Sequence, residues 1–116
     1  MIRVEFYRIR HGQGWQGFQV SGHSGFAAYG EDIVCAAVSA LAQTAVLGVT
    51  EVVGLDCQVE IDEDDGLLLC LLPEQLSPRD NGKAQLILEV LYKGLMAIEE
   101  EYGKHVSVKE VPYREN

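Results

Sequence analysis

A histidine, an aspartate and a cysteine lie close together in one short, glycine-containing stretch of the chain. His23 comes first, Asp32 follows after a loop, and Cys35 stands at the start of a long, alanine-rich apolar run. Because aspartate is a favoured N-cap, we expect a helix that begins at Ile33 with Asp32 as its cap. In that first turn the helix dipole and unpaired N–H groups lower a thiol pKa towards roughly 3.5–7.5. A thiolate within reach of a histidine is an activated nucleophile.

Each of these residues also has a plainer interpretation. A cysteine often only fills space in a core, and a loop histidine often only bonds to backbone. The separation of His23 and Cys35 (35 − 23 = 12 residues) permits contact but does not establish it. Asp32 either caps the helix or orients His23, as the acid of a catalytic triad does, and the cap is the simpler interpretation. Ser39, four residues after Cys35, either hydrogen-bonds near the site or packs as a small residue.

The rest of the sequence shows little rival chemistry. The three cysteines are odd in number and include no CxxC pair, so neither a disulfide framework nor a zinc knuckle is indicated. We expect no metal and no cofactor. Cys57 and Cys70 fall on predicted strands and are interpreted as core residues. The glycines at 22, 25 and 30 lack the context of a phosphate-binding loop. The acidic run at 60–65 fails as a calcium loop, because apolar residues would fall at its first and last ligand positions, and we interpret it as a solvated hairpin tip.

Composition and charge limit the partners. The chain has 116 residues, which suits a single domain over 1–116. Nine basic against 18 acidic residues give a net charge of −9, which disfavours direct nucleic-acid binding and favours a basic partner. We expect neither a signal peptide, because charges interrupt the N-terminal residues, nor a membrane span, because we judge every apolar run to be shorter than about 18 residues. A cytoplasmic location is therefore expected.

The hydrophobic pattern predicts two helices and five strands. Period-two alternation and short apolar runs place the strands at 2–9, 15–20, 56–63, 67–72 and around 106–108. Apolar residues at three- and four-residue spacing predict a helix from Ile33 to between Gly48 and Gly54. A second helix is expected between Ser77, its N-cap, and Gly103. The order ββαββαβ predicts an α/β (α+β) two-layer sandwich, with a mixed sheet of about five strands covered by helices on one or both faces.

One stretch resembles the signature of a known enzyme family. A histidine precedes a glycine-containing loop, and an acid, two aliphatic residues and a cysteine then begin the helix. The matching residues are Gly22, His23, Phe26, Ala27, Gly30, 32–37 and Ser39. In this motif, and in length, element order and acidity, the chain resembles the ribosomal-processing cysteine proteases, the Prp family. It departs from the family at Ser24, where the family commonly has alanine.

The resemblance implies a cysteine endopeptidase that acts in ribosome maturation. Its substrate would be a basic precursor of a large-subunit ribosomal protein, the twenty-seventh, from which it removes an N-terminal extension. His23 and Cys35 would be catalytic, with Asp32 and Ser39 in support. The family forms homodimers, which suits the apolar first helix and the apolar strand at 67–72.

We expect the Cys35 thiolate to attack the scissile carbonyl while His23 serves as base and then as acid for the leaving amine. Backbone N–H groups of Val34 and Cys35 would stabilise the oxyanion. The loop at 24–31 would close over an extended peptide. The residues expected to contact substrate or move with this lid are Gly22, Ser24, Gly25, Phe26, Tyr29 and Gly30. The alternative is a non-catalytic, ribosome-associated binding module in which Cys35 only packs.

Overall fold

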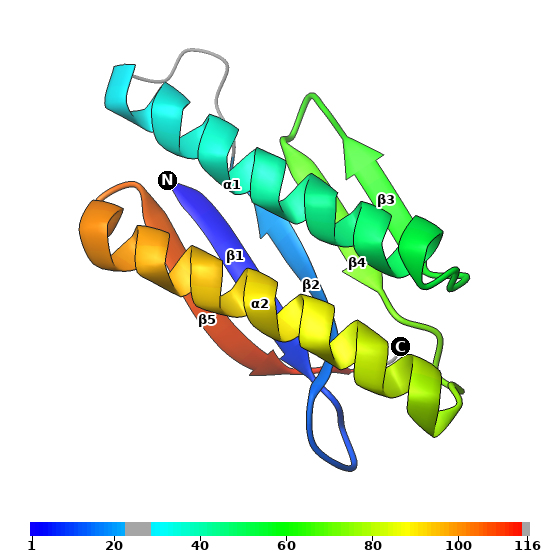
Figure 1. The fold of residues 1–116 in the computed structure, drawn as a ribbon. Coiled ribbons are helices and arrows are strands. Elements are labelled where there is room, and N and C mark those ends of the chain that lie inside the picture. The colour runs from blue at the N-terminus through cyan, green and yellow to red at the C-terminus, as the bar shows by residue number, and fades with distance from the viewer. Residues whose placement is uncertain (23–28, 115–116) are drawn as a thin grey trace.

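The computed structural model describes residues 1–22 and 29–114, with the backbone alone for 29–32. It contains the predicted order of five strands and two helices (Figure 1). The elements are β1 (Ile2–Arg8), β2 (Trp15–Ser21), α1 (Tyr29–Leu47), a short π-helix η1 (Gly48–Val52), β3 (Gln58–Asp62), β4 (Leu67–Leu71), α2 (Pro78–Tyr102) and β5 (Val106–Pro112).

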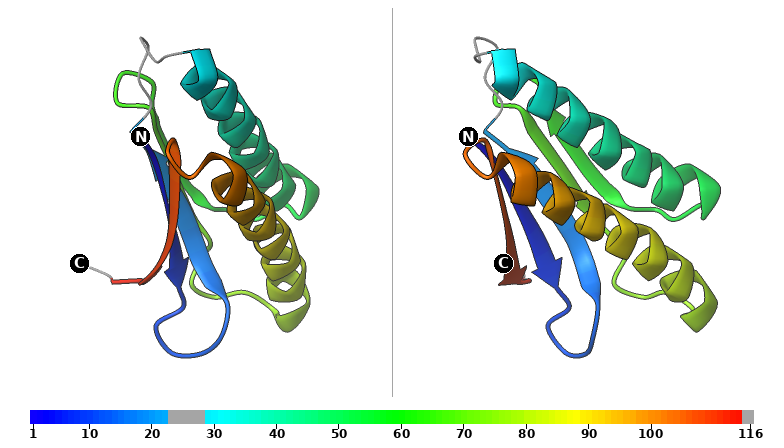
Figure 2. Two further views of the ribbon diagram at one scale, coloured as in Figure 1. Left: turned by 90° about the vertical axis from the view of Figure 1, so that its left-hand side faces the viewer. Right: turned by 60° about the vertical axis from the view of Figure 1, so that its left-hand side comes forward.

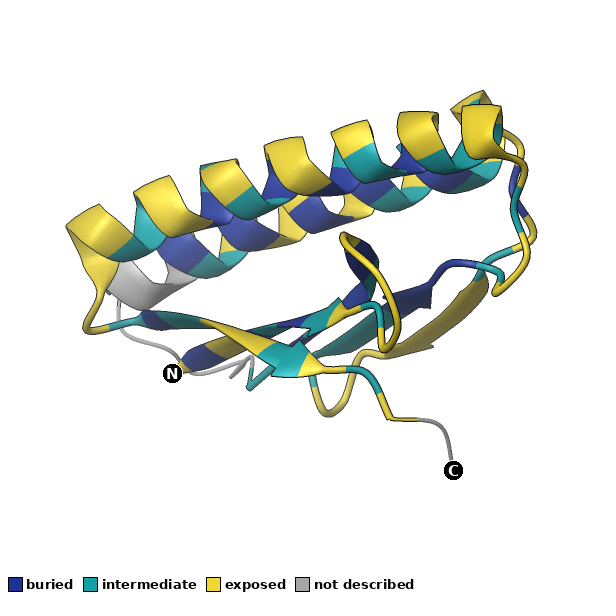
Figure 3. Cartoon of the chain, turned by 90° about the horizontal axis from the view of Figure 1, so that it is seen from below, coloured by how far each residue is buried: buried dark blue, intermediate teal, exposed yellow. Residues whose placement is uncertain are grey.

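The strands form one mixed sheet in the order β3-β4-β2-β1-β5. Its pairs are antiparallel except for β1 and β5, which run parallel because α2 carries the chain back across the sheet. Both helices lie on the same face of this sheet, and no described helix covers the opposite face (Figures 2 and 3). The predicted two-layer sandwich is therefore confirmed, with its helices on one face.

The core fills the space between the helices and the sheet. Period-two alternation turns Ile2, Val4 and Phe6 of β1 towards the helices, where each is buried. Phe6 stacks on Phe18 with ring centroids 5.6 Å apart and meets Tyr92 of α2 edge-on at 5.1 Å. The helices contribute one buried stripe each: Val34, Val38, Ala42 and Ala45 from α1, and Ala84, Leu88, Leu91 and Leu95 from α2.

The start of α1 corrects the sequence prediction. The helix begins at Tyr29, so Asp32 is its fourth residue and not its N-cap, and Cys35 is the seventh residue, in the second turn. Tyr29 and Gly30 belong to the helix and not to a loop over 24–31. One glycine costs a helix only about 1 kcal/mol, and the acids Glu31 and Asp32 suit the positive end of the dipole.

The apolar character of α1 also exceeds the sequence prediction. The stretch Ile33–Val52 has the length and hydropathy of a membrane span, so our judgement on apolar runs was wrong. A core helix passes the same test, and here Val38 and Ala42 pack into the core. Because 28% of the stretch is buried within the chain, a large apolar surface that includes Leu47 and Val52 stays exposed.

The second helix begins as its local sequence predicts. The Ser77 hydroxyl accepts a hydrogen bond from the Asp80 N–H at 3.1 Å, and Pro78 occupies the first turn, where a missing N–H is harmless. Gly103 is the C-cap, but its φ of −60° is helical, so the left-handed freedom of glycine is not used there.

Candidate active site

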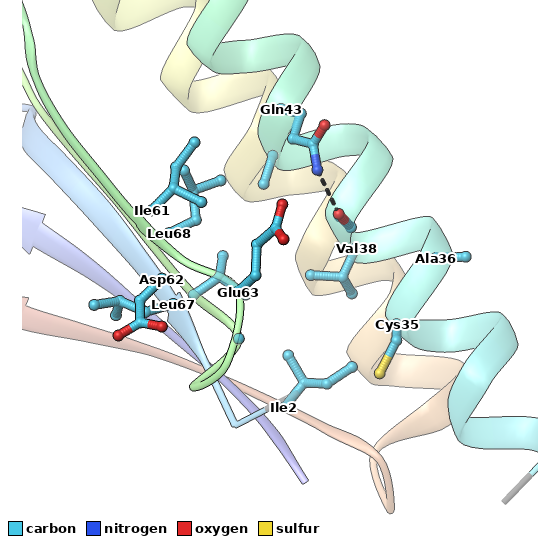
Figure 4. A pocket seen from close by; sticks show the side chains of 14 residues that line it. Ile2, Cys35, Ala36, Val38, Gln43, Ile61, Asp62, Glu63, Leu67 and Leu68 are labelled. Atoms are coloured by element: carbon cyan, nitrogen blue, oxygen red, sulfur yellow. Dashed lines mark hydrogen bonds between the residues drawn. The ribbon is translucent and has the colours of Figure 1, made fainter. Parts of the chain in front are cut away.

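A groove of about 520 Å³ lies between the middle of α1 and the β3–β4 hairpin (Figure 4). Its apolar lining comes from both layers of the fold: Ile2, Val20 and Leu68 from the sheet, and Val38 and Ala42 from α1. Of these, Val38 and Ala42 are buried in the core, so the groove opens directly above the packed interior. An open, largely apolar groove suits an extended peptide better than a compact polar ligand.

Cys35 is the cysteine that lines this groove, and its sulfur points into it (Figure 4). The side chain is half-buried. Ser39 follows one helical turn later on the same face, and its hydroxyl accepts a hydrogen bond from the Gln43 side-chain amide at 2.8 Å. The structure therefore brings Cys35 and Ser39 together along one row of α1, as their four-residue spacing predicts.

Several predicted site residues lie outside the described part of the chain. These are His23, Ser24, Gly25 and Phe26. The chain leaves β2 beside the groove, because Val20 lines it and the strand ends at Ser21, two residues before His23. Gly22 has a φ of +89°, which a side chain would strain. Tyr29, Gly30 and Asp32 are placed as backbone in the first turn of α1.

The predicted oxyanion donors do not fit this helix. Val34 and Cys35 are the sixth and seventh residues of α1, so the α-helical pattern directs their N–H groups to the carbonyls of Gly30 and Glu31. N–H groups without a helical acceptor belong to the first four residues of a helix. The earlier start of α1 thus engages the two amides that a start at Ile33 would have left unpaired.

Of the residues that line the groove, the sequence predicts only Cys35 and Ser39 as site residues; Gln43, Ile61 and Glu63 are among those that it missed. Gln43 lies eight residues after Cys35 and continues its row on the helix. Glu63 was interpreted as part of a solvated hairpin tip. Its side chain points from the hairpin towards α1 (Figure 4). The turn itself is held by Asp62, whose carboxylate accepts hydrogen bonds from the N–H groups of Asp64 and Asp65 at 3.0 and 3.3 Å.

The other two cysteines lie in a different environment. Cys70 is fully buried on β4, and burial, followed by the neighbouring Cys57 thiol, raises its pKa from 9.0 to about 12. Burial also raises the pKa of the half-buried Cys57. Such thiols stay protonated at neutral pH and are poor nucleophiles. Among the described residues, no group of His, Cys, Asp and Glu side chains is arranged to hold a metal ion.

Comparison with known proteins tests the family resemblance. Residues 1–107 match the family model of the cysteine protease Prp. The chain is 37% identical over 101 residues to the ribosomal processing cysteine protease Prp of Bacillus subtilis, covering 87% of this chain and 90% of that protein. It is 30% identical to the Staphylococcus aureus Prp over 87 residues, 75% of this chain and 78% of that one.

Solved structures show the same fold. The S. aureus protease Prp in complex with a substrate peptide superimposes with a TM-score of 0.83 at 25% identity, covering 96% of this chain and all of that one. A Streptococcus mutans protein gives 0.82 at 27% identity, covering 97% and 96%. The sequence resemblance to this family is therefore confirmed. The chain belongs to the Prp family of cysteine proteases.

Proposed function

We propose that this protease removes the N-terminal extension of a large-subunit ribosomal protein, the twenty-seventh, during ribosome maturation. The observation that carries the proposal is the Cys35 sulfur facing an open, largely apolar groove. The relatives are named for ribosomal processing, and one is solved with a substrate peptide, which supports an extended peptide as the substrate class.

In the proposed reaction Cys35 and His23 act as a pair. His23 takes the thiol proton, the thiolate sulfur bonds to the scissile carbonyl carbon, and the carbonyl becomes an oxyanion. When this intermediate collapses, the peptide C–N bond breaks and His23 gives the proton to the leaving amine. Water, activated by the same histidine, then hydrolyses the thioester and restores the thiol. Asp32, one turn before Cys35 on α1, and Ser39, one turn after it, are the supporting residues.

A homodimer is the second part of the proposal. The uncovered surface of α1 and η1 includes Leu47 and Val52, which are 52% and 82% exposed, and the stretch Ile33–Thr50 contains no charged residue. Burying such a surface against a second copy stabilises by about 25 cal/mol per Å². The proposed reaction partners are assembling ribosomal proteins, so the proposed location is the cytoplasm.

The third part of the proposal is electrostatic attraction of the substrate. A net charge of −9 attracts a basic ribosomal-protein precursor during encounter. Association should therefore slow as salt rises from roughly 50 to 500 mM, a range over which the Debye length shortens to a few ångströms. Stopped-flow binding to the Cys35→Ala variant measures this rate, and a rate independent of salt would exclude steering.

The deciding experiment is incubation of the protein with the extended ribosomal-protein precursor. We expect the parent to release the extension, Cys35→Ala to lose at least roughly 10⁴-fold in rate, and Cys57→Ala to stay close to the parent. Mass spectrometry of the two products locates the cleaved bond. If the parent binds the precursor without cleaving it, the protein is the alternative binding module.

A further inference from the structure

The row of side chains that begins at Cys35 extends along the groove for two helical turns. Cys35, Ser39 and Gln43 are spaced by four residues, and all three line the groove. A rise of 1.5 Å per residue places Gln43 about 12 Å beyond Cys35 along α1. An extended peptide advances about 3.3 Å per residue, so it covers that distance in roughly four residues.

The wall opposite Gln43 carries a carboxylate. The Glu63 side chain projects from the hairpin into the space in front of α1, whereas Asp62 points away from the helix (Figure 4). The Asp62 carboxylate is engaged by two N–H groups of the turn. Within the described residues Glu63 forms neither an ion pair nor a side-chain hydrogen bond, so its carboxylate is available to a ligand.

The groove beside Glu63 is apolar. Val38 and Ala42 line its helix side and Ile61 its hairpin side, and Ile61 is 65% exposed. A lysine or arginine side chain matches this combination, because its methylene stem packs on apolar surface while its charged head reaches an acceptor. The Gln43 amide nitrogen is engaged with Ser39, which leaves the amide oxygen as a second acceptor.

We propose that Glu63 and Gln43 form a substrate subsite that selects a lysine or arginine roughly four residues from the scissile bond. The subsite rests on the proposed peptide cleavage at Cys35 and adds a specificity determinant to it. Cys35 provides the reaction, and the distal pair sets the register in which an extended peptide presents its carbonyl to the sulfur. An apolar groove alone permits a peptide to slide, and a charged anchor at a fixed distance limits that freedom.

The test is a panel of peptides that span the processing junction of the precursor. Lysine, glutamine or glutamate is placed singly at each of the four positions on either side of the scissile bond. With the parent we expect lysine to exceed glutamine in kcat/KM by roughly two- to fivefold at one position three or four residues away, as for a partly solvated ion pair. Glu63→Gln should remove this preference, and Glu63→Lys should reverse it in favour of glutamate.

Glu60→Gln is the matched control. It removes the same charge from the same hairpin, but Glu60 alternates with Ile61 and therefore lies on the sheet face away from the groove. The lysine preference should survive Glu60→Gln. If Glu60→Gln and Glu63→Gln weaken it equally, general electrostatic attraction explains the effect and the subsite is wrong.

A binding measurement separates this proposal from the proposed function. Fluorescence anisotropy of the same labelled peptides on Cys35→Ala requires no cleavage. If the parent cleaves nothing, yet lysine peptides bind Cys35→Ala roughly two- to fivefold tighter than glutamine peptides and Glu63→Gln abolishes the difference, the subsite stands and the protease proposal falls. If the parent cleaves every peptide of the panel alike and binding is equally indifferent to charge, the subsite is excluded and the protease proposal stands.

Discussion

Cys35 and the Cys57–Cys70 pair show how one residue type acquires opposite properties in the same small fold. Cys35 projects from a helix at the boundary between the two layers, where the groove keeps its sulfur accessible. Cys70 projects from a strand paired on both sides and faces the core, where it has no exposed surface. Position between the layers, and not the identity of the residue, decides which thiol is available for chemistry.

The two-layer arrangement explains why Cys35 and Cys70 differ in exposure. A helix packed on a sheet buries one stripe and leaves its flanks beside the cleft, so Val34 and Val38 are buried while Cys35 between them is half-exposed. A strand inside the sheet has no flank, because its neighbours lie about 4.8 Å away on each side. A reactive residue on this flank of α1 therefore removes little side-chain packing from the core. The same residue on β4 is enclosed by its neighbours and loses its reactivity.

The largest effect that we expect from this contrast is in alkylation by iodoacetamide at about pH 7. A thiol with a pKa of about 12 carries a thiolate fraction of roughly 10⁻⁵ at that pH, and Cys70 is also shielded from the reagent. Cys35 should therefore react at least roughly 10²-fold faster than Cys70. Peptide mapping by mass spectrometry measures each site separately.

Cys57 lies between these extremes and serves as the internal standard. It is half-buried with a raised pKa, so it should react more slowly than Cys35 and faster than Cys70. In urea all three thiols should react at similar rates, which shows that the fold causes the ranking. A folded protein in which Cys70 reacts as fast as Cys35 would contradict the contrast.

How far the sequence predicts the fold depends on how local each signal is. Ser77, Pro78 and Asp80 lie within four residues, and the start of α2 follows from them. The start of α1 did not follow from Asp32, because a good cap residue does not exclude a helix that begins earlier. Nothing in the sequence chooses one sheet face for both helices, since that depends on the packing of α1 against α2.

The residues of the candidate site likewise divide into those that local spacing predicts and those that only the packing of distant segments brings together. Cys35 and Ser39 were predictable on one helical face, because their spacing is a property of the helix alone. Glu63 was not, because 28 residues separate it from Cys35 (63 − 35 = 28) and only the packing of the β3–β4 hairpin beneath α1 brings it to the groove. His23 stays a prediction, since it lies outside the described residues.

The next largest effect should be a loss of stability when the pairing of β2 with β4 is disturbed. Gly17 pairs with Leu71, and a Cβ there would collide with the Cys70 carbonyl and lie 2.9 Å from the Leu71 Cα. Backbone atoms cannot turn aside as a side chain does, so Gly17→Ala should lower the free energy of unfolding by roughly 3 kcal/mol. Urea denaturation measures this loss.

The same variant weakens the contrast between the thiols, because a displaced β4 opens the core around Cys70. Alkylation of Cys70 should accelerate in Gly17→Ala while that of Cys35 changes little. Gly82→Ala on α2 is the matched control, since a Cβ there meets nothing within 4 Å and should stabilise the helix by up to about 1 kcal/mol. Full stability in Gly17→Ala would mean that β4 shifts without cost.

The smallest effect is in the alkaline stability of the fold. The pKa of Cys70 rises from 9.0 to about 12 in the folded chain, so between these values the unfolded chain has lost a proton that the folded chain keeps. The contribution of this thiol to the free energy of unfolding is therefore fully present below pH 9. Above pH 9 it should decline by at most about 1.4 kcal/mol per pH unit. Urea unfolding at about pH 8.5, 9.5 and 10.5 measures the slope.

Cys70→Ala removes this contribution and should flatten the decline, whatever its effect on stability at neutral pH. The raised pKa values of Tyr7 and Tyr92 act in the same direction and remain in the variant, so the difference between the two slopes reports the coupled thiols of Cys70 and Cys57. Equal slopes in the parent and Cys70→Ala would show that the core admits a thiolate, and the separation between reactive and packed cysteines would then rest on access alone.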